Sequence, residues 1–118
     1  MPPGLRSTVD EVRELARTLP RSTEAFVRGR IKFRVGSIVW LAFSRDGTEI
    51  GFAFPKEWRQ ALVESEPDKF MLPSEPDLRF NWVEARLDAL DPEETRELVL
   101  EAWSMVVPRY VVAEHLHS

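Results

Sequence analysis

The chain contains 118 residues with a formal net charge of −4 and no cysteine. This length predicts one domain over residues 1–118 with a single core, and we expect its ends, 1–7 and 116–118, to fray. The absence of cysteine excludes a disulfide framework, a thiolate nucleophile and a cysteine-ligated metal centre. No apolar run approaches the roughly 20 residues of a membrane helix, and the N-terminus carries no apolar signal segment. We therefore expect a cytoplasmic protein with no membrane role.

The charges are distributed unevenly along the chain. Residues 1–60 contain 11 Lys and Arg against 7 Asp and Glu, whereas residues 61–118 contain 5 against 13. Such an asymmetry concerns surface potential and partners rather than fold. The pI near 5.2 argues against a protein that coats nucleic acid indiscriminately. A local basic face in the first half of the chain is still compatible with it.

The first predicted element is a helix that begins after Thr8 and ends at Pro20. Thr8 and Glu11 form a capping-box pattern, and apolar residues then recur at helical spacing. Over residues 22–54 the apolar period falls to two and β-branched or aromatic residues dominate. Turn signals in this stretch fall at Gly29, Gly36-Ser37 and Asp46-Gly47. The pattern predicts a meander of antiparallel strands.

A second helix is predicted to start at Pro55 and to stop before Pro67. Its expected buried face contains Trp58, Ala61 and Leu62. Residues 67–77 contain three prolines and several acids, so we expect a surface loop there. A last strand is predicted over residues 78–87. Its two faces carry Val83, Ala85 and Leu87 on one side and Trp82, Glu84 and Arg86 on the other.

The chain is predicted to end in two helices. Asp91 and Pro92, followed by two glutamates, have the composition of a helix N-terminus, and this helix should continue to Pro108. Residues 109–116 form a shorter predicted helix. The order of elements, with hairpin-linked strands and separate helices, predicts an α+β fold. We expect two layers, an antiparallel sheet with the helices packed on one side.

The sequence offers little catalytic chemistry. Both histidines, His115 and His117, lie in the last four residues, where a catalytic geometry is hard to maintain, and no nucleophile or phosphate-loop motif is present. We therefore expect no enzyme, no cofactor and no dedicated metal site. Glu93, Glu97 and Glu101 recur every four residues and form an acidic ridge. Such a ridge can attract hard cations weakly, but a solvent-facing helix surface is the favoured interpretation.

A basic stripe is the clearest functional candidate. Arg28, Arg30, Lys32 and Arg34 alternate with Gly29, Ile31, Phe33 and Val35, so a strand would turn the cations to one face and the apolar residues to the other. Arg21 precedes this stripe, and Arg45, Lys56 and Arg59 can extend it. A positive face can meet nucleic-acid phosphates, an acidic protein or an anionic small molecule. Ordinary solvation of an outer strand is equally compatible, and Glu24 or Glu49 can neutralise part of the stripe.

Most aromatic residues, Trp58 among them, are expected in the core because a small domain must bury its large side chains. Trp82 is the candidate exception. It lies near Arg79 and on the opposite face from Val83 and Ala85, where an aromatic ring can stack on a base or another planar ligand. Burial in the core is the favoured interpretation of Trp82 as well.

Several short motifs occur in a distinctive order between Thr8 and Leu116. They are Leu19-Pro20, Glu24, the segment from Gly29 to Gly36 (GRIKFRVG), Asn81-Trp82-Val83, Leu87, Ala102-Trp103 and Val107-Pro108-Arg109. In this order the chain resembles the MmcQ/YjbR family of small bacterial proteins. The resemblance implies a two-layer α+β fold of the frataxin-like or secretion-chaperone-like kind. Members of that family are commonly labelled DNA-binding, and no catalytic residues carry over.

The chain departs from the family pattern at three places. It has Arg21 where members often have glycine, Ala53 where they often have lysine, and Phe80-Asn81-Trp82 where histidine often precedes Gly-Trp. The missing lysine and histidine weaken an anion-binding role for that part of the sheet, whereas Arg30 and Trp82 are retained. The first hypothesis is a noncatalytic protein that binds DNA through the basic sheet face. The alternative is a protein-interaction or chaperone-like adaptor, and the sequence leaves the oligomeric state open.

Overall fold

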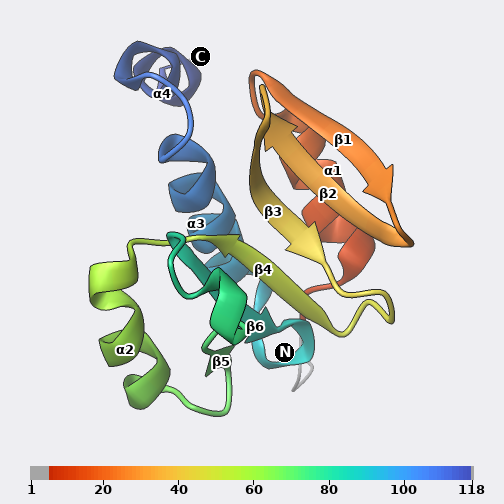
Figure 1. Ribbon diagram of the computed structural model, residues 1–118. Helices are drawn as coiled ribbons and strands as arrows, with labels where there is room; N and C mark the ends of the chain where they lie inside the picture. Colours follow the sequence, from red (N-terminus) through yellow and green to blue (C-terminus); the bar gives the residue numbers. More distant parts are fainter. Residues whose placement is uncertain (1–5, 118) are drawn as a thin grey trace.

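The computed structural model describes residues 6–117, which form a six-stranded antiparallel sheet and four α-helices (Figure 1). The helices are α1 (Val9–Thr18), α2 (Lys56–Ser65), α3 (Pro92–Ser104) and α4 (Arg109–Leu116). The strands are β1 (Ser22–Val27), β2 (Arg30–Val35), β3 (Ile38–Phe43), β4 (Glu49–Ala53), β5 (Phe70–Met71) and β6 (Trp82–Arg86). Two 3-10 turns, η1 (Glu75–Asp77) and η2 (Leu87–Ala89), flank β6. The prediction of an α+β fold with an antiparallel sheet is confirmed.

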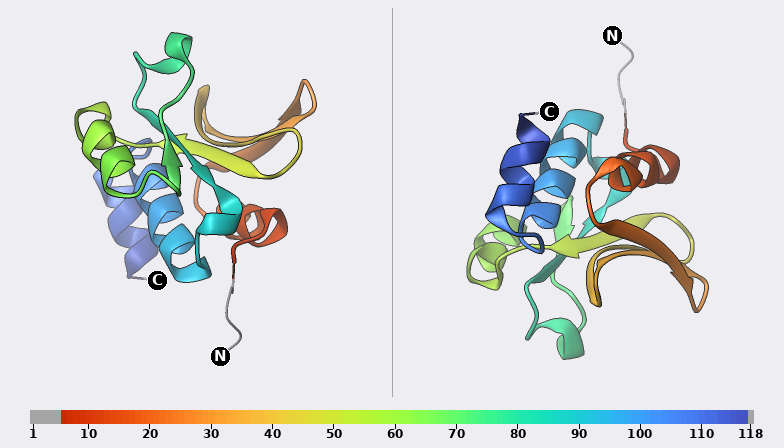
Figure 2. Two further views of the ribbon diagram at one scale, coloured as in Figure 1. Left: turned by 90° about the horizontal axis from the view of Figure 1, so that it is seen from below. Right: turned by 90° about the horizontal axis from the view of Figure 1, so that it is seen from above.

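The strands lie in the order β1-β2-β3-β4-β6-β5. The first four form the predicted meander, and β6 pairs with β4 on its free side. Figure 2 shows α1, α3 and α4 on one face of the sheet, while α2 lies beside the end formed by β5 and β6. The loop that contains η1 rises on the opposite face (Figure 2). We call this second face the open face.

The register of the sheet produces two alternating rows of side chains. In one row Phe33, Leu41, Phe52 and Val83 are cross-strand neighbours, and all four are almost completely buried beneath the helices. Trp40 is an additional residue in β3, placed at a register shift between Phe33 and Arg34, and it packs on Phe33 with a ring separation of 6.2 Å. Because a bulge sets two consecutive residues against one partner, Trp40 and Leu41 both enter the core.

Two helices, α1 and α3, begin with the capping residues predicted from the sequence. The Thr8 hydroxyl accepts a hydrogen bond from the backbone N–H of Glu11, and Glu11 in turn accepts one from the N–H of Thr8. The Asp91 carboxylate accepts a hydrogen bond from the backbone N–H of Glu94 at the start of α3. These side chains satisfy amide groups that have no partner inside the helix.

Three local predictions are wrong. Residues 67–77 were expected to form only a loop, yet Phe70–Met71 pairs with β6 and closes that edge of the sheet. The last strand begins at Trp82 rather than at residue 78, because residues 78–81 form a turn and bend in which the Phe80 N–H donates to the Asp77 carbonyl. In α2, Trp58 is 66% exposed and its neighbour Arg59 is buried, the reverse of the expected amphipathic arrangement.

The ends of the described range are well anchored. Ser7 is buried, hydrogen-bonds with Thr95 and donates its backbone N–H to the carbonyl of Leu90. The helix α4 continues to Leu116. The fraying expected for 1–5 and 118 lies outside the described residues, whereas Ser7 and Leu116 belong to the ordered structure. Within 6–117 no helix combines the length and the apolar character that a membrane crossing requires.

Candidate binding site on the open sheet face

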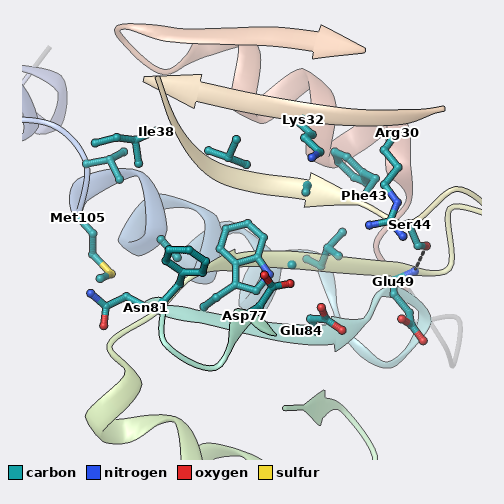
Figure 3. A pocket seen from close by; sticks show the side chains of 18 residues that line it. Arg30, Lys32, Ile38, Phe43, Ser44, Glu49, Asp77, Asn81, Glu84 and Met105 are labelled. Atoms are coloured by element: carbon teal, nitrogen blue, oxygen red, sulfur yellow. Dashed lines mark hydrogen bonds between the residues drawn. The ribbon is translucent and has the colours of Figure 1, made fainter. Parts of the chain in front are cut away.

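The open face contains a row of side chains that differs sharply from the buried row beside it. Cross-strand pairing places Lys32, Ala42, Gly51 and Glu84 in register across β2, β3, β4 and β6. The two central positions are small, so the middle of the sheet lies low between charged side chains at either end of the row. This arrangement produces a cleft of about 670 Å³ (Figure 3).

The cleft has walls of different chemistry (Figure 3). Arg30 and Lys32 form a cationic wall on β2. Glu49, Asp77 and Glu84 supply carboxylates from β4, η1 and β6. Ile38 and Met105 supply apolar side chains at one end of the cleft, and Phe80 is a further apolar lining residue. The cleft is therefore suited to a ligand that carries acceptors or negative charge on one side and donors on the other.

Trp82 occupies the floor of the cleft because Gly51 has no side chain. A Cβ at Gly51 would lie only 2.6 Å from the indole Nε1 of Trp82, so the ring fills the space that any other residue would take. Trp82 is half-buried, and no residue among 6–117 accepts a hydrogen bond from its indole N–H. The predicted placement of Trp82 opposite Val83 and Ala85 agrees with the structure, but the core position favoured from the sequence is wrong.

Glu84 has an unusual electrostatic environment. Burial raises the pKa of its carboxyl above the ordinary value of 4.5, and the nearby charges of Glu49 and Asp77 raise it further, while Arg30 acts in the opposite direction. No group within residues 6–117 donates a hydrogen bond to this carboxylate or forms an ion pair with it. Glu84 thus presents unsatisfied acceptor oxygens to the cleft.

Arg59 fixes the segment that forms the rim of the cleft. Its guanidinium donates hydrogen bonds of 2.8–3.0 Å to the carbonyls of Leu78, Phe80 and Trp82. Arg59 was a possible extension of the basic stripe, yet its charge is directed into the protein. At the same rim the Asn81 side-chain oxygen accepts a hydrogen bond from the backbone N–H of Lys56.

The structure separates the predicted basic stripe into parts. Arg28 lies in the β1–β2 turn with a φ of 54°, so it is not a strand residue. Arg30 is exposed and Lys32 half-buried, and both line the cleft. Arg34 lies outside the cleft, half-buried, with its Nε buried and without a hydrogen-bond partner among the described residues. The expectation of four cations on one strand face is therefore wrong at Arg28, whereas Arg30, Lys32 and Arg34 are strand residues and Arg34 is half-buried rather than exposed.

Arg45 joins Arg28 and Arg30 at one corner of the sheet. Its side chain lies against Gly29, with Nε 3.7 Å from the position of a Cβ at that glycine. We call Arg28, Arg30 and Arg45 the basic corner. None of the three forms an ion pair within residues 6–117.

The remaining predicted cations lie at the other end of the cleft. Lys56 Nζ donates to the carbonyl of Arg79 at 3.4 Å, and the Arg79 guanidinium lies over the Phe80 ring at 4.7 Å. Glu24, considered as a neutraliser of the stripe, instead forms ion pairs with Arg13 and Arg17 of α1.

Sequence reasoning missed the roles of Gly51 and Asp77. The alternation of Trp82 and Glu84 on one strand face was the available signal for the acidic wall.

The other sequence candidates do not form a second site. Among the described residues no three His, Asp or Glu side chains gather closely enough to hold a metal ion, and this includes the α3 ridge of Glu93, Glu97 and Glu101. His115 is not a solvated tail residue, because its ring packs on Trp103 at a centroid distance of 5.2 Å. His117 is exposed.

Comparison with known proteins identifies relatives of this chain. The YjbR family model matches residues 17–105. Among solved structures, the chain is similar to the crystal structure of Deinococcus radiodurans protein DR2400, which has a DUF419 family domain. The two share 18% sequence identity with a TM-score of 0.74, covering 97% of this chain and 91% of that one. No curated protein sequence matches the chain significantly.

Proposed function

The chain belongs to the YjbR family, and on this premise we propose that it is a noncatalytic nucleic-acid-binding protein that uses the open face of its sheet. The observation that carries the proposal is the basic corner. Arg28, Arg30 and Arg45 come together there without an ion pair within residues 6–117, at the border of a cleft that Arg30 lines. Unpaired arginines of this kind favour phosphate groups, which they bind through bidentate, charge-assisted hydrogen bonds.

Cations elsewhere in the protein support this interpretation by contrast. Arg13 and Arg17 pair with Glu24, Lys69 pairs with Glu66 and Glu94, and Arg59 binds three carbonyls. At the open face, by contrast, Arg30 and Lys32 line the cleft and form no ion pair within residues 6–117. A ligand that carries anionic groups can form charge-assisted hydrogen bonds with these unpaired cations.

The backbone at Arg28 adds a second line of support. Arg28 and Gly29 have φ values of 54° and 79°, the combination of a type I′ hairpin turn. Glycine, asparagine or aspartate fits the first of these positions at lower cost, and a residue such as arginine is strained there by roughly 1 kcal/mol. An arginine at this position is consistent with selection for its charge.

We include the absence of catalysis in the proposal. The cleft residues of the described chain include no histidine, and the Ser44 hydroxyl that faces the cleft donates its hydrogen bond to Asp46. Hydrogen bonds from Thr48 and Ser44 hold the pKa of Asp46 below its ordinary value of 3.8, so this carboxylate is a weak base and does not activate the hydroxyl as a nucleophile. The nucleic acid should therefore be recovered chemically unchanged after binding.

Binding should respond to salt and to the basic corner. We expect fluorescence anisotropy with labelled DNA and RNA oligonucleotides to show log K falling linearly with log salt concentration. The double substitution Arg30→Ala and Arg45→Ala should reduce that slope by about one for each lost phosphate contact. Arg96→Ala is the matched control, because Arg96 is exposed on α3, away from the open face. A flat salt response, or an equal loss in the control, contradicts the proposal.

A protein-interaction role is the second candidate, supported by one specific observation. Ile38, Phe80 and Met105 are 55%, 50% and 41% exposed, and all three line the cleft. Apolar side chains gathered in this way are common at docking surfaces of adaptors or chaperone-like proteins. A partner complex that survives nuclease treatment and is lost on Met105→Glu would favour this function over nucleic-acid binding.

A further inference from the structure

We propose that the cleft holds one unstacked nucleobase of a single strand against Trp82, and that it prefers bases with an exocyclic amino group. The inference rests on the proposed function and specifies the ligand of the same site. Three features carry it: the shape of the cleft, the aromatic floor and the carboxylate wall.

The shape of the cleft suits a base rather than a duplex. A cavity of about 670 Å³ lies within the range of pockets that enclose small organic ligands. Ile38 and Met105 lie at one end of it, and Asp77 of η1 lines one side (Figure 3). Bases in a double helix are stacked and paired, so only a single strand or an extruded nucleotide can place a base inside such a cavity.

The aromatic residues provide a surface for stacking. Trp82 lies on Gly51 in the centre of the cleft, and Phe80 is half-exposed at its rim. Base–aromatic stacking is the main sequence-tolerant contact in single-strand binding. Gly51 thus has a defined role, since it leaves the depth that the indole ring needs in the sheet.

The carboxylate wall adds selectivity. Glu49, Asp77 and Glu84 line the side of the cleft opposite Arg30 and Lys32 (Figure 3), and Glu84 receives no hydrogen bond within residues 6–117. Adenine, cytosine and guanine carry amino groups that can donate to a carboxylate, as cytosine N4 does to Asp or Glu. Thymine and uracil present carbonyl oxygens in place of that amino group, and these repel a carboxylate.

The two walls together orient the strand. Phosphates of the bound strand lie toward Arg30 and the basic corner, and the edge of the base lies toward Glu84. A ligand with anionic groups at one end and N–H donors at the other matches this distribution of charge. A phosphate compound without a base matches the cationic wall but offers no N–H donor to the carboxylate wall.

The test compares homopolymers of deoxyadenosine, deoxycytidine and thymidine of equal length in the same anisotropy assay. We expect the cytosine and adenine strands to bind about tenfold more tightly than thymidine, the effect of one charge-assisted hydrogen bond. Glu84→Gln should reduce this preference toward one while leaving the salt slope unchanged. Glu97→Gln, on the exposed surface of α3, is the matched control and should keep the preference.

Fluorescence identifies the base-binding surface independently. Binding should quench tryptophan emission in the wild type, and the quench should disappear in Trp82→Phe. Gly51→Ala should also weaken it, because the added methyl group displaces the indole. If Gly51→Ala fails to fold, Trp82→Phe and Glu84→Gln are sufficient for the test.

The outcomes separate the two proposals. Salt-dependent binding with thymidine strands as tight as cytosine strands, or with a quench that persists in Trp82→Phe, overturns the base-binding inference and leaves the proposed function intact. A lack of binding to every oligonucleotide overturns both.

Discussion

The two faces of the sheet use the same strands in opposite ways. On the covered face the row of Phe33, Leu41, Phe52 and Val83 is closed off from solvent by the helices. On the open face the neighbouring row, from Lys32 to Glu84, surrounds a cleft and contains charges without partners. Packing alone accounts for every side chain of the first row. It does not account for the charges of the second row, which is why we propose a binding function for the open face.

The largest expected difference between the faces is in stability. Phe33→Ala should lower the free energy of unfolding by about 3–5 kcal/mol, because it leaves a cavity beside Trp40 and Phe43. Lys32→Ala, one residue away on the open face, should change it by less than about 0.5 kcal/mol. Urea unfolding with an unchanged slope measures both values. Similar losses in the two variants would mean that the open face is as tightly packed as the covered one.

The covered face was largely predictable from the sequence, and the reason is periodicity. Strand alternation and the capping residues Thr8 and Asp91 are local signals, and the structure keeps them. The exceptions involve tertiary contacts. The two residues of β5 are too short for a periodic signal, and the bulge at Trp40 interrupts the alternation without any glycine or proline to mark it.

The open face was predictable only in part. The alternating cations were visible, but Arg28 belongs to a turn whose strained conformation the sequence did not indicate. The inward Arg59 and the outward Trp58 reverse the helical pattern, because three carbonyls of the rim segment outweigh the apolar preference for burial. The cleft depends on a small residue, Gly51, whose significance appears only when Trp82 is placed across the strand from it.

A smaller effect on stability is expected at the rim of the cleft, residues 78–82. Arg59→Met should lower the free energy of unfolding by about 2 kcal/mol. The substitution removes the hydrogen bonds from the guanidinium and leaves the carbonyls of the rim segment without this donor. Amide hydrogen exchange should increase around residues 78–82 before it increases in the core. Gln60→Ala, an exposed neighbour of Arg59 on α2, is the control and should leave exchange around residues 78–82 unchanged. Uniform exchange across the chain would contradict a local role for Arg59.

The smallest expected effect is the pH dependence of stability that arises from two carboxylates, Glu24 beside α1 and Glu84 in the cleft. Burial raises the pKa of Glu24, but hydrogen bonds and charges from Arg13 and Arg17 outweigh it, so the pKa lies below the ordinary 4.5. Its stabilisation is present above that value and is lost as the pH falls through the lowered pKa. Because the pair is partly exposed, Glu24→Gln should cost only about 0.5–1 kcal/mol near neutral pH.

Glu84 should show the opposite sign. Its pKa in the folded protein is raised above 4.5, chiefly by burial, so folding is favoured at low pH and loses stability as the pH rises through the raised value. Glu84→Gln should therefore equal or slightly exceed the wild type near neutral pH, and the gain should vanish in acid. Urea midpoints measured on both sides of the carboxyl range test this. Destabilisation of Glu84→Gln at neutral pH would show that Glu84 is a structural carboxylate like Glu24, and the acidic wall would then need no ligand to explain it.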